Sequence, residues 1–151
     1  METTRVFMGN APATVDDKGR LKLPQAFRGL LEPKYGRELF VTSITGDHVR
    51  VYPMPVWADI LQKFANGTTL DPSKMRFLER VNYYGAAAEL DAQGRILIPL
   101  RLRQSAAMTG EVDVLGQITF LEVWNHDRLE TKIARDGFGD DDLRRIAELG
   151  V

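Results

Sequence analysis

Apolar and polar residues alternate along a short stretch near the start of the chain, directly after a turn that contains glycine. Leu21 and Leu23 lie on one face of a predicted strand, and Arg20 and Lys22 lie on the other, because successive side chains of a strand point to opposite faces. The preceding turn covers residues 17–20, where glycine can adopt the positive φ that a chain reversal needs. The pattern predicts a tight hairpin with one buried face and one basic face.

Elsewhere apolar residues recur every three or four positions, which predicts helices. Trp57, Ile60, Leu61 and Phe64 form one such apolar stripe. Further helices are expected after Pro24 and Pro99, from Asp71 to Tyr84, after Asn125, and from Asp140 to Gly150. Two further strands are expected to end at Val15 and Leu90, and others are expected to cover 39–42, 49–52, 114–115 and 120–124. The predicted fold class is α+β, with helices flanking short, mostly antiparallel strands.

The chain contains an internal repeat. Residues 13–28 align with residues 88–103 without a gap, at an offset of 75, and six of the sixteen pairs are identical. Farther on, residues 49–52 match residues 121–124 at an offset of 72. Two copies are too few for a solenoid of stacked repeats, so we expect internal pseudo-twofold symmetry. The predicted organisation is one compact domain, 1–151, made of repeat 1 (7–64), a connecting helix (65–84), repeat 2 (85–135) and an acidic C-terminal tail (136–151).

Composition narrows the class of protein. The 151 residues, 44% hydrophobic and 27% charged, suit a folded domain with its own core. The absence of cysteine excludes disulfides and thiolate metal sites, and two histidines argue against a histidine-rich zinc site. No secretory signal and no apolar run of about 18 residues is present, so we expect a cytoplasmic protein without a membrane partner. No nucleophile elbow, phosphate loop or metal-ligand spacing occurs, which predicts a protein that is not an enzyme and takes no cofactor and no small-molecule substrate.

Charge is distributed unevenly along the chain. The formal net charge is −1, yet the stretch from Lys18 to Lys34 holds five bases and one acid. From Asp127 onward, seven acids outnumber five bases. A local basic face on a nearly neutral protein can still bind phosphate, because nearby charges count most under screening.

The motif Asp-x-x-Gly-Arg occurs once in each repeat, at Asp16–Arg20 and at Asp91–Arg95, with Gly19 and Gly94 as its glycines. The aspartate can bond the amides of the turn or hold the guanidinium in one orientation. An oriented arginine suits a phosphate or a guanine edge, because its planar fork makes two parallel hydrogen bonds. A structural ion pair that only holds the turn explains the same residues, and the motif does not decide between the two.

The two repeats differ around this motif. Repeat 1 adds the bases Lys18, Lys22 and Arg28, whereas repeat 2 replaces both lysines, with Gln93 and Leu97, and keeps Arg95, Arg101 and Arg103. We therefore expect unequal binding by the two copies, and a larger loss of binding for Arg20→Ala than for Arg95→Ala.

Other candidate residues have plainer interpretations. Asp140, Asp141 and Asp142 lack the glycine and glutamate of a calcium loop and suit a helix N-terminus. The remaining expectations are His48 in a loop or at a strand edge, His126 in a first helical turn, Arg76 and Arg80 on a solvated helix face, and Tyr83, Tyr84 and Trp124 in core or subunit contacts.

The chain resembles the MraZ family. The resemblance rests on Phe7-Met8-Gly9, on both Asp-x-x-Gly-Arg motifs with Pro24 and Pro99, on Val51-Tyr52-Pro53 with Trp57, and on the segments 114–117 and 122–124. It runs from about Phe7 to Ile133 and leaves out the acidic tail after Arg135.

The resemblance implies two swapped-hairpin, AbrB-like halves fused in one chain, and ring-shaped homo-oligomers associated with the nucleoid. It implies a transcriptional regulator, usually a repressor, that binds direct repeats of double-stranded DNA in its own promoter, upstream of the division and cell-wall gene cluster. The family's DNA-contacting arginine matches Arg20, its flanking lysine matches Lys18, and its second-copy arginine matches Arg95. The neighbouring bases Lys22, Arg28 and Arg103 complete the predicted DNA-binding set.

Two alternatives stay open from the sequence. One is an AbrB-like antitoxin or a general DNA-bridging protein with little preference for repeats. The other is a ring with a purely structural or protein-interaction role, whose Asp–Arg pairs only hold turns. In any ring, head-to-tail interfaces are required, and we expect the helix 71–84 to contribute to them.

Overall fold

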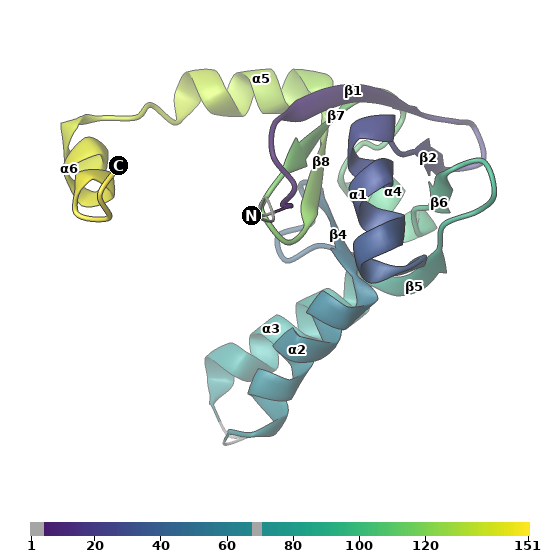
Figure 1. The fold of residues 1–151 in the computed structure, drawn as a ribbon, viewed down its shortest axis with the longest axis horizontal. Helices are drawn as coiled ribbons and strands as arrows, with labels where there is room; N and C mark the ends of the chain where they lie inside the picture. Colours follow the sequence, from purple (N-terminus) through teal and green to yellow (C-terminus); the bar gives the residue numbers. More distant parts are fainter. Residues whose placement is uncertain (1–4, 68–70) are drawn as a thin grey trace.

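Short strands form an eight-stranded antiparallel sheet in the part of the chain that this computed structural model describes, residues 5–67 and 71–151 (Figure 1). The strands are β1 (Asn10–Val15), β2 (Arg20–Lys22), β3 (Glu38–Thr42), β4 (Val49–Pro53), β5 (Ala86–Glu89), β6 (Arg95–Leu97), β7 (Gly110–Gly116) and β8 (Leu121–Asn125). Their order is β5-β3-β4-β8-β7-β1-β2-β6. The two ends of the sheet meet, because the Asp91 amide after β5 donates to the Arg95 carbonyl on β6 at 3.0 Å.

Each repeat pairs its strands mainly with those of the other repeat. β1 contacts β2 at the single pair Val15↔Leu21 but lies along the whole of β7, and β5 lies along β3 in the same way. β2 pairs with β6, and Leu21 faces Ile96 at the centre. The exchange confirms the predicted α+β class with two interlocked swapped-hairpin halves, and this central pair lies on their pseudo-twofold axis.

The alternating residues of the two hairpins fill the core, as the pattern predicts. Leu21, Leu23, Ile96 and Ile98 are all buried. They pack in one large apolar cluster with residues of β3, β4, β7 and β8. A second, aromatic cluster lies under the helices that follow β4, where Trp57 stacks on Phe40 and packs against Tyr52.

Six helices are found in the described residues: α1 (Gln25–Tyr35), α2 (Met54–Ala65), α3 (Pro72–Tyr84), α4 (Leu100–Ser105), α5 (His126–Arg135) and α6 (Asp140–Ala147). In Figure 1, α2 and α3 form a hairpin that projects from the sheet, while α5 and α6 extend away in another direction. Asn125 caps α5 as expected, since its side chain accepts from the Arg128 amide at 3.1 Å. None of the helices in the described part is long and apolar enough to cross a membrane.

Several predicted boundaries were wrong. The last helix ends at Ala147 and not at Gly150, because the amides of Leu149 and Gly150 bond carbonyls three residues back and tighten the chain into turns. The strand expected at 114–115 extends over all of β7, because β1 pairs with it along its length. In the connecting segment 65–84 the helix begins at Pro72, and residues 68–70 of that segment lie outside the described residues.

Candidate nucleic-acid interface

The turn of repeat 1 is organised by the carboxylate of Asp16. One of its oxygens accepts from the amides of Lys18 and Arg20 at 3.0 and 2.8 Å, and the other accepts from Nε of Arg20 at 2.8 Å. The hydrogen bond that the Arg20 backbone amide donates to Asp16 is the main reason that the pKa of Asp16 lies below its ordinary value. Gly19 completes the reversal with a φ of 83°. The same aspartate therefore holds the turn and orients the arginine, so the two roles considered for the motif occur together.

Repeat 2 builds the same turn. Asp91 accepts from the amides of Gln93 and Arg95 at 2.9 and 2.8 Å and from Nε of Arg95 at 3.0 Å, and Gly94 has a φ of 77°. The pKa of Asp91 is also lowered, mainly by the hydrogen bond that the Arg95 backbone amide donates to it. In both turns the aspartate engages Nε, and among the described residues the two Nη groups of each arginine have no hydrogen-bond partner. Each guanidinium is thus fixed at one edge and open at the other.

The pairing of β2 with β6 brings both arginines onto one surface. Arg20 lies opposite Leu97, and Lys22 lies opposite Arg95. All four side chains project from the outer face of the two strands, because the residues between them are buried in the core. We call this outer face the β2–β6 ribbon. Like charges placed directly across a strand pair repel. A bound anion would offset the repulsion between Lys22 and Arg95, so this face suits an anionic partner.

Two of the predicted DNA-binding residues lie beneath the turns instead. A side chain on Gly19 would lie 2.3 Å from the guanidinium carbon of Arg103, and one on Gly94 would lie 2.6 Å from Nη1 of Arg28. Nη2 of Arg28 also donates to the Ala92 carbonyl at 3.2 Å. Each arginine therefore packs under the turn of the other repeat and supports it. Their contact with DNA stays a prediction, and what the structure shows is their packing under the turns.

The lysines of the set are exposed. Lys18 is on the turn beside Arg20, and Lys22 is on the β2–β6 ribbon itself. Arg101, the extra arginine of repeat 2, lies elsewhere, with its guanidinium 4.2 Å from the centre of the Tyr83 ring. The structure thus brings Lys18, Arg20, Lys22 and Arg95 to one edge of the molecule.

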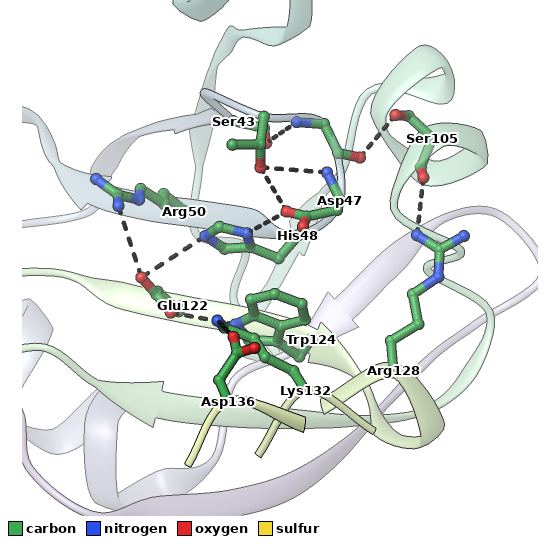
Figure 2. A network of polar contacts seen from close by, with 12 residues as sticks. Ser43, Asp47, His48, Arg50, Ser105, Glu122, Trp124, Arg128, Lys132 and Asp136 are labelled. Carbon is green, nitrogen blue, oxygen red and sulfur yellow. Dashed lines mark hydrogen bonds and ion pairs between the residues drawn. The ribbon is translucent and has the colours of Figure 1, made fainter. Parts of the chain in front are cut away.

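A polar cluster is centred on the buried His48 (Figure 2). The ring of His48 stacks on Trp124 with centroids 4.3 Å apart, Nδ1 lies 2.7 Å from Asp47, and Nε2 lies 3.6 Å from Glu122. Burial opposes the charged imidazole, but the two carboxylates outweigh it and raise the pKa of His48. Arg50, 3.7 Å from Glu122, extends the cluster.

The sequence places His48 before a strand but does not reveal its burial. The internal repeat could have indicated this burial. At the offset of 72 residues, the counterpart of His48 in repeat 2 is Phe120, an apolar aromatic residue that stacks on Tyr52 with ring centroids 4.7 Å apart. The other expectations are confirmed for His126, which begins α5, for Asp140, which begins α6, and for the exposed Arg76 and Arg80.

A metal ion has one candidate place among the described residues. The ligand atoms of His126, Asp127 and Glu130 lie within 4.8 Å of one another. However, Nδ1 of His126 already lies 2.7 Å from Asp113, and this contact raises the pKa of the half-buried histidine. The group is accounted for by ion pairs at the start of α5.

The interlocked hairpins and their paired Asp–Arg turns define an α+β protein of the fused swapped-hairpin class. Comparison with known proteins identifies the family. The family model described as "MraZ protein, putative antitoxin-like" matches residues 6–80 and 85–147. The chain belongs to the MraZ family, a family of transcriptional regulators and not of enzymes, as predicted. The match reaches residue 147, so the resemblance seen in the sequence, which ended near Ile133, was drawn too short.

The relatives span nearly the whole chain. The transcriptional regulator MraZ of Acidobacterium capsulatum is 42% identical over 146 residues, covering 97% of this chain and 100% of the relative. The transcriptional regulator MraZ of Koribacter versatilis is 40% identical over 147 residues, with the same coverage of both chains. The transcriptional regulator MraZ of Herpetosiphon aurantiacus is 37% identical over 138 residues, covering 90% of this chain and 91% of the relative.

Proposed function

We propose that this protein is a sequence-specific DNA-binding regulator of transcription, and that the β2–β6 ribbon is the surface that meets DNA. One observation carries the proposal: Arg20, Lys22 and Arg95 project from the same outer face of two paired strands, and Lys22 directly faces Arg95. A two-stranded ribbon has the width that the major groove of DNA admits.

The residues of the ribbon have different roles in this proposal. Asp16 and Asp91 fix Arg20 and Arg95 by Nε, so that the open Nη edge of each can contact a guanine or a phosphate in one orientation. Lys18 and Lys22 supply contacts to phosphate that do not depend on sequence. The net charge of −1 does not oppose this, because only one edge of the protein needs to be basic.

Resemblance to the family motivates a finer proposal. We propose that the protein forms a ring of identical subunits, associates with the nucleoid in the cytoplasm, and represses the division and cell-wall gene cluster by binding direct repeats in its own promoter. A ribbon on each subunit would meet a repeat of matching spacing, and linked sites gain affinity through effective concentration. The names of the relatives, which are transcriptional regulators, support the regulatory part of this proposal.

The antitoxin-like description of the family keeps a second function in view. An antitoxin or a DNA-bridging protein would use the same basic ribbon but would bind scrambled repeats as well as native ones. A protein with a purely structural role would not bind double-stranded DNA even at low salt.

The test is a fluorescence anisotropy titration with DNA from immediately upstream of the protein's own gene, on native and scrambled repeats at two salt concentrations. We expect tight, repeat-dependent binding that weakens steeply with salt. Arg20→Ala should lose about 1–3 kcal/mol, or roughly 5- to 150-fold in affinity. Arg95→Ala should lose less, because Lys18 lies on the turn beside Arg20 whereas the uncharged Gln93 lies beside Arg95.

Two controls make the titration decisive. Arg145→Ala removes the same charge from an exposed position on α6 and should leave the affinity unchanged. Arg20→Lys keeps the charge but removes the planar fork, so it should bind scrambled repeats normally and lose its preference for native ones. Equal losses for Arg20→Ala and Arg95→Ala would reject the asymmetry, and a flat salt response would reject phosphate as the main contact.

A further inference from the structure

The C-terminal part of the chain carries large apolar side chains that cover nothing. Residues 133–151 are all exposed, and in Figure 1 α5 and α6 extend away from the sheet. The exposed apolar side chains are Ile133, Phe138, Leu143, Leu149 and Val151, each between 56% and 89% exposed, with Ile146 at 37%. Apolar groups gathered on an exposed segment indicate an interaction surface.

The helix α6 presents an ordered apolar face within this segment. Leu143, Ile146 and Ala147 fall at helical spacing on one side. Asp140 and Asp142 border that stripe, while Arg145 lies on the opposite side of the helix. Residues 136–151 hold five acids and two bases, so this face disfavours DNA and suits a basic surface of another protein.

A surface of matching chemistry exists on α3. Arg76, Arg80 and Tyr83 lie on one side of that helix and line, with Glu79, Asn82 and Tyr84, a hollow of about 720 Å³. Tyr83 is 56% exposed, and Arg101 from α4 stacks on its ring and donates to its carbonyl at 3.2 Å. Arginine and tyrosine are the residue types that dominate binding energy at protein interfaces.

We propose that α6 of one copy docks along α3 of a second copy, with Leu143 and Ile146 against Tyr83, and Asp140 and Asp142 toward Arg76 and Arg80. The two surfaces lie on arms that leave the sheet in different directions (Figure 1), so each copy offers one α6 and accepts one at its α3. Such a head-to-tail interface generates a closed ring when its rotation closes. The inference deepens the ring of the proposed function and rests on it for the identity of the partner.

The test uses two variants of the full-length protein and light scattering after size exclusion. The donor variant, Leu143→Glu with Ile146→Glu, disables α6, and the acceptor variant, Arg76→Glu with Arg80→Glu, disables α3. We expect wild type to be oligomeric and each variant to be monomeric. An equimolar mixture should form dimers and nothing larger, because the intact α6 of one variant meets the intact α3 of the other and neither can continue the chain.

The controls separate this contact from misfolding and from failure of DNA binding. Arg145→Glu changes the opposite side of α6 and should assemble as wild type does, and circular dichroism should be unchanged in every variant. Both monomeric variants should bind a DNA with one repeat as tightly, per subunit, as wild type. Monomeric wild type, a fully assembled acceptor variant, or a mixture without dimers would each overturn the proposal. Loss of DNA binding in an intact oligomer would instead contradict the function assigned to the ribbon.

Discussion

The two hairpins share a geometry but differ in their chemistry. The hydrogen bonds that Asp16 and Asp91 accept differ by at most 0.2 Å between corresponding pairs. Around these equal turns, repeat 1 carries Lys18 and Lys22, where repeat 2 carries Gln93 and Leu97. Both repeats keep the conformation of the turn, because each turn must hold its hairpin. Only repeat 1 carries the two lysines beside it. The two turns therefore differ in charge and not in Asp–Arg geometry.

The swapped pairing changes the meaning of this difference. Because β2 and β6 lie side by side, the two hairpins do not present separate surfaces. They form the two edges of one ribbon, of which the β2 edge is richer in positive charge. The predictions below test the shared geometry first and the different charges second.

The largest effect is expected from filling a turn glycine. Gly19→Ala and Gly94→Ala should each destabilise the protein by about 1–3 kcal/mol, because alanine is strained at positive φ and its Cβ would collide with Arg103 or Arg28. The loss should be similar in the two repeats, since both turns have the same construction. Urea unfolding, monitored by tryptophan fluorescence, measures it.

Gly9→Ala is the matched control for these variants. Gly9 also has a positive φ, 81°, but a Cβ there meets nothing within 4 Å. It should cost less than either turn variant, and the difference isolates the crowding against the exchanged arginine. Equal costs at all three glycines would show that Arg28 and Arg103 do not support the turns.

A smaller effect is expected when the charges of the repeats are made equal. Gln93→Lys with Leu97→Lys gives repeat 2 the lysines of repeat 1 and should strengthen DNA binding without unfolding the protein, because both positions are exposed. Each new phosphate contact should steepen the slope of log affinity against log salt by about 0.9. Anisotropy titrations over a salt series measure that slope, and an unchanged slope would place repeat 2 away from the phosphates.

The smallest effect concerns the other place where the repeats differ, His48 and its counterpart Phe120. The folded pKa of His48 lies above 6.5, so the charged ring contributes stability that is fully present below pH 6.5 and is lost as the pH rises through the folded pKa. His48→Phe keeps the stack on Trp124 but removes this dependence. The free energy of unfolding of wild type, minus that of the variant, should therefore fall between pH 5.5 and 8.5.

That difference is informative because other groups cancel from it. His126 also has a raised pKa, but it titrates in both proteins. A difference that does not change with pH would show that folding leaves the pKa of His48 unaltered, and a difference that rises with pH would show that burial outweighs the two carboxylates.

The sequence predicts the local structure well and the pairing poorly. Alternation and glycine spacing predict the hairpins, and the caps at Asp71 and Asn125 mark two helices that the structure confirms. These signals act over a few residues. The placement of Arg28 and Arg103 under the turns depends on contacts across the two repeats, which the spacing of residues along the chain does not show.

The same limit applies to the face of the ribbon and to the C-terminal segment. Nothing local in β2 indicates that Lys22 will face Arg95, because that pair is set by the exchange of strands. The helix at Asp140 is predictable from its acidic first turn, but its isolation from the core is a matter of three-dimensional packing.

The exchange of strands also fixes an order of events during synthesis. The partner that β1 needs along its whole length is β7, about 100 residues later in the chain. A ribosome that adds roughly 5–20 residues per second leaves β1 without that partner for about 5–20 s. Ile96 and Ile98, which cover Leu21 and Leu23 in the fold, also follow about 75 residues later, so the apolar face of the first hairpin stays uncovered until repeat 2 has been made.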